Sequence, residues 1–504
     1  MISVPAACGP LPHPTAKLPQ SASHSSGMSS SELPPTPARS PTWLGRLWAW
    51  RRDVSLQQLY ANTAKLFSGH AVSAFVGLGT IWFATAGLGV WQFGILTALL
   101  SFTSLVGNTL KFSTWEAVVK YGADDLSRSD AEALRRLVAF NTLLDVGTAL
   151  VSLLVCGGLA YVILPLIKVP GEYLPFALFM SLSAFFTVSA TPVGVLRLFD
   201  RFGLLAITEP IGPIVRLGLC ALFYYLGWSI WAFGAAYLIS SAIDRLLTVW
   251  LGWRELRQRD MVPGWRHVWA RHTEGHPGLW KFVLANNGRT SLGVITKQSD
   301  DLIVAAFAGP TGAALWRIAK QVSSVLTGPA RIFVISVFPQ LARLWSARSY
   351  RSFRRLVVRS SVTSTVGALL VVAAFAALGP FLLHLFFHKA SQHQFLDAYL
   401  PALLLMISRV ATVLMSPFGP ALTAMGRAVR NLKLALMLAM ISVPMLLVLT
   451  WQFGLIGAAL SRIVAETLTA VVFGWTVMKA VNARVRSEES PPAPESARSA
   501  AIGS

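Results

Sequence analysis

Apolar residues along this chain fall into runs of about 20, divided by short polar or basic stretches. The apolar core of a bilayer is about 30 Å thick, and a helix rises about 1.5 Å per residue, so each run is long enough to cross it. We expect twelve spanning helices in two sets of six. The first set covers about 66–88, 91–112, 138–163, 175–197, 203–226 and 231–252, and the second about 285–308, 311–337, 360–387, 397–418, 432–451 and 455–478. This pattern predicts an all-α polytopic membrane protein.

Basic residues gather in every second loop between these runs. Loops rich in Lys and Arg stay on the cytoplasmic side of a membrane, so the bias orients the bundle with both termini cytoplasmic. The opposite loops are short and nearly free of charge, with Lys168 and Lys389 as exceptions. The basic loops hold Lys120, Arg128, Arg135 and Arg136, then Arg197 and Arg201, then Arg343, Arg348, Arg351, Arg354, Arg355 and Arg359, and then Arg427, Arg430 and Lys433.

The two sets of six runs resemble each other. Three features recur at a separation of about 220 residues, as a duplicated unit predicts. They are the turn at Gly89 and Gly309, the pair Thr191-Pro192 and Ser416-Pro417, and the segments Phe233–Ala236 and Ile456–Ala459. Because each unit has an even number of helices, the repeats are parallel and related by an axis along the membrane normal. We therefore expect two lobes around a central cavity, which is an architecture of alternating access.

Polar stretches set the expected domain boundaries. Residues 1–40 are rich in Pro and Ser and lack the apolar core of a cleavable signal peptide, and Met28 is an alternative start. The expected parts are a disordered tail with a basic interfacial helix (1–56), a first lobe (57–252), a cytoplasmic linker (253–281), a second lobe (282–482) and a disordered tail (483–504).

Composition excludes several functions. The chain of 504 residues is 54% hydrophobic and 13% charged, with a net charge of +21. Nucleic acid is not the expected partner, because the positive charge lies in alternate loops between spans. The three cysteines have no metal-ligand spacing, so we expect no metal site. No GxxxxGK[ST] motif is present, so ATP hydrolysis does not drive this protein.

Two central spans carry charges that lipid disfavours. The first holds Arg289, Lys297, Asp300 and Asp301 within an arc of roughly 120° on a helix. The second holds Arg317, Lys320, Gln321, Ser324, Gly328 and Arg331, spaced as one narrow stripe. Charged residues in spanning helices normally face a bundle interior or a wet cavity. Five cations and two acids predict a cationic cavity for an anionic cargo.

Several short motifs occur in a characteristic order along about residues 60–480. They are Gly89–Gly94, Trp115–Gly122, Asp300–Val304, Phe338–Arg343 and Phe453–Leu460. In this order they resemble the polysaccharide-flippase branch of the multidrug/oligosaccharidyl-lipid/polysaccharide exporter superfamily. Many members of this branch have fourteen spans, whereas this sequence predicts twelve.

The resemblance implies a bacterial inner-membrane flippase for cell-surface polysaccharide biosynthesis. Such a protein moves an undecaprenyl-pyrophosphate-linked oligosaccharide from the cytoplasmic to the periplasmic leaflet. The implied partners are this anionic lipid-linked glycan, membrane lipids, and polysaccharide polymerase or assembly proteins. No cofactor is implied, and coupling to H⁺ or Na⁺ stays open, with Asp300, Asp301 and Glu209 as candidates.

Each candidate residue in the central spans also has a structural interpretation. Mirrored about residue 309, Asp301 lies level with Arg317, so the two could simply form an interhelical salt bridge. Lys297 and Lys320 would contact cargo or pair with Asp300. Arg289 and Arg331 would either extend to lipid headgroups or capture pyrophosphate at the cavity mouth.

Other spans carry isolated charges. Glu209 and Arg216 lie on one face of a helix broken by Pro210 and Pro213, so they form either a buried pair or a hinge-linked gate. Arg409 stands alone in the tenth span, which favours a functional role. Arg462 and Glu466 are spaced for an ion pair along one helix.

The leading hypothesis is an alternating-access flippase that is not an enzyme. A drug or cation antiporter of the same superfamily is one alternative, but it predicts unpaired acids in the cavity of the first lobe, whereas the charge surplus here is positive. A polysaccharide polymerase or ligase is another, but it predicts a large periplasmic loop with basic catalytic residues, and the expected periplasmic loops are short.

Overall fold

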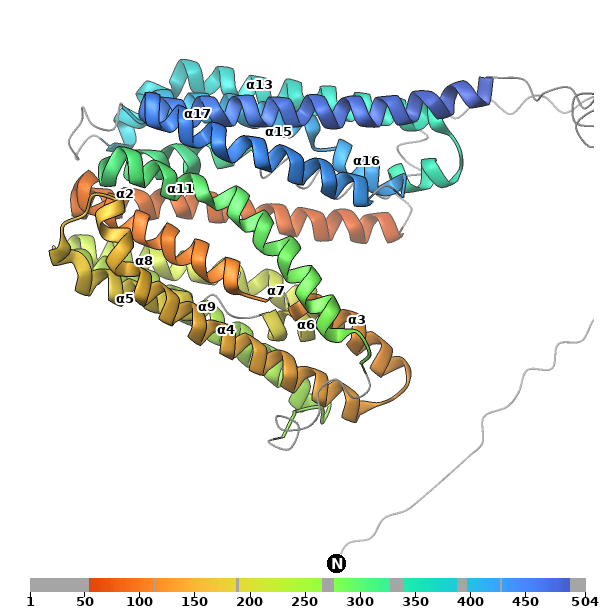
Figure 1. Cartoon of the computed structure of the whole chain (residues 1–504), viewed down its shortest axis with the longest axis horizontal. Coiled ribbons are helices and arrows are strands. Elements are labelled where there is room, and N and C mark those ends of the chain that lie inside the picture. The colour runs from red at the N-terminus through yellow and green to blue at the C-terminus, as the bar shows by residue number, and fades with distance from the viewer. Residues whose placement is uncertain are drawn as a thin grey trace, which may run out of the picture. The chain divides into compact units, whose positions relative to one another are not determined.

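The computed structural model describes residues 54–489 apart from 113, 187–189, 265–275, 327–336, 338–339, 388–396 and 427. The chain divides into two units, Met1–Leu56 and Gln57–Ser504, and the description below concerns the second. The described part of the chain is almost entirely helical (Figure 1). The predictions for the N-terminal tail and for residues 490–504 fall outside the described residues.

Five long helical stretches form the first six spans. Helix α2 (Val54–Leu110) contains the first two and departs from helical geometry at Gly89, where φ is 73°. The others are α4 (Ala131–Leu166), α5 (Leu174–Phe185) followed by α6 (Ala190–Leu198), α7 (Phe202–Thr208) followed by α8 (Ile211–Tyr225), and α9 (Ile230–Gln258). A 3₁₀ turn, Gly171–Tyr173, precedes α5, and a shorter helix, α3 (Thr114–Ser127), follows α2.

The second set repeats this plan. Helix α11 (Leu279–Ser323) contains two spans and reverses at Gly309, where φ is 68°, and a 3₁₀ turn (Ser324–Leu326) follows it. Then come α13 (Tyr350–Phe387), α15 (Tyr399–Met415), α16 (Phe418–Ala424) and α17 (Ala428–Glu489). Helix α17 also contains two spans, divided at Gly454, where φ is 57°.

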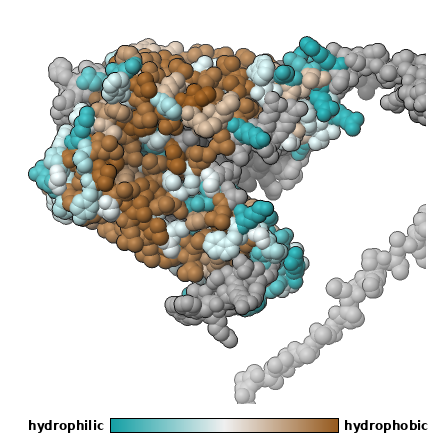
Figure 2. Space-filling model, viewed as in Figure 1, coloured by the Kyte–Doolittle hydropathy of each residue, from teal (hydrophilic) through white to brown (hydrophobic). Residues whose placement is uncertain are grey.

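The described residues contain nine apolar stretches long enough to cross a membrane, and three of them are divided by these glycines, which gives twelve spans. A positive φ is accessible to glycine because it has no Cβ, so the chain reverses there without a loop. The predicted twelve-span α-helical fold is confirmed. Space-filling atoms form an apolar belt with polar residues toward its ends (Figure 2).

The duplication is visible in the backbone. Gly89 and Gly309 both take positive φ between two spans. Helix α15 ends one residue before Ser416-Pro417, and α6 begins one residue before Thr191-Pro192, so both predicted equivalents lie at a helix break or start. Proline lacks an N–H and blocks the preceding helical turn, which explains the break at Pro417.

Two segments differ from the sequence prediction. The loop expected before residue 136 contains α3, whose Ala117 and Val118 are buried against Leu134. The linker expected at 253–281 starts inside α9, which continues to Gln258, and the next helix begins at Leu279. The spans were predicted from apolar runs alone, whereas the helices also include amphipathic and charged turns beyond those runs.

Helices of the two sets meet along α2 and α11. The largest apolar cluster combines Phe93 and Phe233 of the first set with Ala314 of α11. At Gly94 the backbones approach so closely that a Cβ would overlap the carbonyl oxygen of Pro310. Within the second set, α15 packs against both α13 and α17, and α11 packs against α15 and α17. This packing positions the charged residues of α11 among three other helices.

Candidate functional site

A cavity of about 320 Å³ lies between α2, α8 and α9 of the first lobe and α11 of the second. It brings together four of the predicted site residues: Arg216, Arg317, Lys320 and Asp301. Among the described residues that line it, three side chains are cationic and one is acidic. The polar side chains that complete the lining are Ser101, Ser104, Tyr237, Ser241 and Gln298. The cavity is therefore polar and carries a positive surplus.

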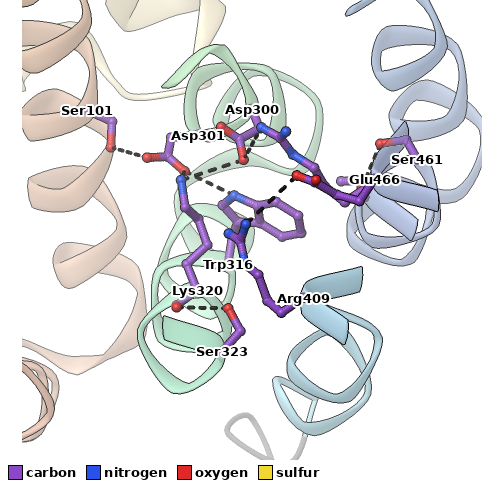
Figure 3. A network of polar contacts seen from close by, with 11 residues as sticks. Ser101, Asp300, Asp301, Trp316, Lys320, Ser323, Arg409, Ser461 and Glu466 are labelled. Atoms are coloured by element: carbon purple, nitrogen blue, oxygen red, sulfur yellow. Dashed lines mark hydrogen bonds and ion pairs between the residues drawn. The ribbon is translucent and has the colours of Figure 1, made fainter. Parts of the chain in front are cut away.

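Asp301 stands at the edge of this cavity with its carboxylate fully engaged. The Nζ atom of Lys320 lies 2.6 Å from Oδ1, and the indole N–H of Trp316 donates to the same oxygen at 3.1 Å. Ser101 of α2 donates to Oδ2 at 3.4 Å (Figure 3). Helix α11 thus supplies both the acid and its main cationic partner.

The salt bridge considered from sequence, Asp301 with Arg317, is not the one that forms. Lys320, which lies one turn further along the polar stripe, forms the ion pair with the Asp301 carboxylate instead. Its long flexible stem lets the ammonium reach back along α11, whereas a rigid guanidinium has fewer ways to do so. Arg317 is half-buried in the cavity wall and has no ion pair among the described residues. It is consequently the least compensated cation of the site.

Behind the cavity wall, Asp300 is the centre of a second set of contacts. Its side chain is only 3% exposed, and its Oδ2 accepts from Arg462 of α17 at 3.0 Å. Lys320 lies 3.6 Å from the same oxygen, so this lysine bridges both adjacent acids (Figure 3). The alternative in which Lys320 pairs with Asp300 is thereby borne out, with Asp301 as the nearer partner.

Arg409 and Glu466 extend the network to α15. Their Nη1 and Oε1 atoms are 4.0 Å apart, so Arg409 is not alone as its sequence context suggested. Arg462 and Glu466, predicted to pair along one helix, each have their ion-pair contact within 4.0 Å on a different neighbouring helix. Close packing of α17 against α11 and α15 brings those partners nearer.

The charges of this network balance. Asp300, Asp301 and Glu466 face three cations, Lys320, Arg462 and Arg409. An unpaired buried ion is strongly destabilising, so a balanced set is what helix packing requires. Lys320 is paired within this network, whereas Arg317 lines the cavity and is not part of the network.

Arg216 of α8 faces the cavity from the first lobe. Its Nε donates to Ser240 at 3.0 Å, and its guanidinium lies 4.6 Å from the ring centroid of Tyr237. Both partners are uncharged groups of α9. Cation–π contact of this kind positions an arginine while its charge stays available.

The remaining predicted residues lie elsewhere. Glu209 is exposed in the link between α7 and α8, so the helix is interrupted there, but Glu209 is not among the residues that line the cavity. Arg289 and Lys297 are on α11, with side chains outside the described residues, and Arg331 lies outside them altogether.

Sequence reasoning missed the polar face of α9. Tyr237, Ser240, Ser241 and Asp244 are spaced i, i+3, i+4 and i+7, which places them on one side of the helix. Tyr237 and Ser241 line the cavity. Tyr237, Ser240 and Asp244 contact or border Arg216. This spacing was the available signal.

It also missed Asp145, which is buried in α4. One carboxylate oxygen accepts from the Thr114 hydroxyl at 2.8 Å, and the other accepts from the backbone N–H of Thr191 at 2.7 Å. Asp145 therefore joins the first turns of α3 and α6. A single acid inside the predicted third span was the signal.

Polar bonds cross between the lobes beside the cavity. Ser104 donates to Gln298 at 3.3 Å, and Ser291 donates to the carbonyl of Thr109 at 2.6 Å. At the end of the bundle that holds Gly309, the ammonium of Lys168 donates to the carbonyl of Phe307 at 2.8 Å. These bonds fix the relation of the two lobes in this conformation.

The family of polysaccharide biosynthesis proteins matches residues 59–345, which is more than half of the chain. The chain belongs to this family. It is 27% identical over 355 residues to the inner membrane protein YghQ of Escherichia coli K12, covering 69% of this chain and 97% of that protein.

Solved transporters share the fold of this polysaccharide biosynthesis protein. An inward-facing multidrug resistance transporter of the multidrug and toxin extrusion (MATE) family has a TM-score of 0.65 at 14% identity, covering 83% of this chain and 96% of that chain. An outward-facing one has a TM-score of 0.53 at 16% identity, covering 84% and 96%.

A further solved relative from Pyrococcus furiosus is described by the reversed polarity of its binding pocket. It has a TM-score of 0.52 at 16% identity, covering 84% of this chain and 96% of that chain. The matches confirm the predicted superfamily branch and the two-lobe transporter fold of a multi-pass inner-membrane protein.

Proposed function

We propose that this protein is a flippase that moves an undecaprenyl-pyrophosphate-linked oligosaccharide across the inner membrane by alternating access. Arg317 supports this proposal most directly, because it faces the cavity without an ion pair among the described residues. With Arg216 opposite, it offers two guanidinium groups to one polar space. The planar guanidinium group of an arginine donates two parallel, charge-assisted hydrogen bonds to phosphate oxygens.

The cavity size suits a headgroup rather than a whole glycan. About 320 Å³ is at the lower end of small-molecule pockets. In the proposed mechanism the pyrophosphate enters the cavity, the polyprenyl chain stays in the bilayer, and the sugars follow through the opening between lobes.

The two lobes then rock about the bound pyrophosphate. Opening at the opposite end, which holds Gly309, requires the loss of Lys168–Phe307, and movement of α11 against α2 requires the loss of Ser104–Gln298 and Ser291–Thr109, each a single hydrogen bond. A net cost of about 0.5–1.5 kcal/mol for each makes such a change reversible. The higher TM-score to the inward-facing relative supports an inward-facing state here, with the basic loops cytoplasmic.

Asp301 is the acid best suited to ion coupling. It borders the cavity and holds Lys320, whereas Asp300 is shielded behind the wall and Glu209 lies away from the cavity. A proton or Na⁺ on Asp301 would weaken its hold on Lys320, and the ammonium would add a third cation to the pyrophosphate site. Release of the ion would restore the pair.

The antiporter alternative receives less support from the same geometry. A drug cation would meet three cations and one acid among the described lining residues, and like charges repel strongly at low dielectric. The one acid among the described lining residues, Asp301, is paired with Lys320, whereas this alternative predicts unpaired acids in the cavity of the first lobe.

The test is a scramblase-type assay in proteoliposomes with a fluorescent polyprenyl-pyrophosphate-linked sugar. We expect the wild-type protein to expose the lipid to an external quencher, and Arg317→Gln to slow this about 10- to 100-fold, because a charged hydrogen bond contributes about 1.5–3 kcal/mol. The matched control Arg257→Gln removes an exposed arginine outside the cavity. Transport of a cationic dye, with no movement of the lipid-linked sugar, would overturn the proposal.

A further inference from the structure

A second hollow, of about 850 Å³, lies in the second lobe where α13 begins and α17 ends. Five arginines line it, and none of the described lining residues is acidic. Arg354 donates to the side-chain oxygen of Asn482 at 3.2 Å, which connects the two helices across the hollow. The arginines are Arg351, Arg354, Arg355, Arg359 and Arg486.

Arg354, Arg355 and Arg359 bring three cations close together near the start of α13. Four of the five arginines lie in the first three turns of α13, next to one another at the end where the helix dipole is positive. Arg351, Arg355 and Arg359 follow one another at i+4, a spacing at which like charges repel. A general bias of basic residues toward one membrane face explains their number. It does not explain why they surround one hollow built from two helices far apart in sequence.

An apolar track leads away from the arginines along α13. Val358 and Val362 line the hollow and are 44% and 53% exposed. Val366 and Leu370 continue the same helical face at i+4 intervals, and Leu370 is 68% exposed. A ligand that fits both parts has an anionic head and an extended apolar chain.

We propose that this hollow binds the phosphate headgroup of an anionic bilayer phospholipid, with one acyl chain lying along Val358, Val362, Val366 and Leu370. The occupant is a bilayer lipid rather than transported glycolipid, because the described residues that line the hollow all lie on α13 and α17 of the second lobe. It shares no lining residue with the cavity between the lobes, and rocking of the lobes leaves it intact. The bound lipid neutralises the start of α13 and anchors the second lobe in one leaflet.

Native mass spectrometry of the purified full-length protein tests this proposal. The protein is delipidated and titrated with phosphatidylglycerol, and phosphatidylcholine serves as the zwitterionic comparison. We expect Arg355→Gln/Arg359→Gln to weaken phosphatidylglycerol binding roughly 30-fold, as the loss of two arginines at a membrane surface implies. The control Arg257→Gln/Arg343→Gln changes the net charge equally at exposed arginines outside the hollow and should bind like wild type.

Two further arms identify the source of the phosphate. Inorganic phosphate and a polyprenyl pyrophosphate are added as competitors, and neither should displace phosphatidylglycerol at equal concentration. Arg355→Lys/Arg359→Lys keeps the charge and should retain most binding, which separates loss of charge from misfolding. Equal binding of phosphatidylcholine, equal binding by the two Gln double variants, or displacement by either competitor would overturn the proposal.

Discussion

The Asp300 network and the cavity beside it use the same residue types in opposite ways. In the network, every cation lies within 4.0 Å of a carboxylate, and α11, α15 and α17 are joined by the pairs. In the cavity, Arg317 has no such partner among the described residues, and Arg216 is held by Ser240 and Tyr237. A cation within 4.0 Å of a carboxylate therefore joins helices, whereas a cation without such an ion pair stays available to a ligand.

The largest effect on stability should come from a substitution in the charge-balanced Asp300 network. Asp300→Asn leaves Arg462 and Lys320 without the carboxylate between them, and loss of one partner of a buried ion pair costs about 3–5 kcal/mol. We expect a lower melting temperature in detergent and less protein in the membrane. The exposed substitution Arg343→Gln is the control, and an unchanged melting temperature for Asp300→Asn would contradict the structural role.

A smaller effect, confined to ligand binding, should follow from a substitution among the residues that line the cavity. Arg317→Gln removes a cation that contributes no ion pair to the described fold, so the melting temperature should stay close to wild type. Binding of a short-chain polyprenyl pyrophosphate should weaken about 10- to 100-fold, through loss of about 1.5–3 kcal/mol. Calorimetric titration measures the affinity. A destabilised protein with normal affinity would reverse the roles assigned to the two regions.

Asp301 lies at the boundary of the two regions, and its substitution should have a mixed effect. Asp301→Asn weakens the contact with Lys320 but leaves Asp300 within 3.6 Å of the same ammonium. We expect about 1–3 kcal/mol of destabilisation, less than for Asp300→Asn, together with transport that no longer responds to a proton or Na⁺ gradient. Transport by this variant that still follows the gradient would exclude Asp301 as the coupling acid.

The smallest effect should come from a bond between the lobes. Ser104→Ala removes the bond to Gln298 and about 0.5–1.5 kcal/mol from the state described here. The equilibrium between inward- and outward-facing states should shift by roughly 2- to 12-fold toward the other state. Distances between spin labels on the two lobes measure this shift, and Ser183→Ala, which removes a hydroxyl that bonds within the first lobe, is the matched control.

Much of the fold could be predicted because it depends on local signals. Run length and the turns at Gly89 and Gly309 are properties of short stretches, and they give the twelve spans. The residues of the cavity were only partly predictable. Spacing on one helix identified the stripe of Arg317 and Lys320, because a helical face follows from sequence alone.

The pairing of the charges could not be predicted in the same way. Which carboxylate a lysine or arginine reaches depends on the packing of α15 and α17 against α11, and helices far apart in sequence decide it. Arg409 therefore looked solitary, and Arg462 looked like the partner of Glu466. The polar face of α9 could have been read from spacing, but its role depends on Arg216 lying opposite.

The reversals at Gly89, Gly309 and Gly454 have a practical consequence for mapping this protein from outside. Each joins two spans through one residue, so proteases find no extended segment there, and an inserted epitope would push apart tightly packed hairpins. Proteases added from the side on which these glycines lie should therefore leave the three hairpins uncut.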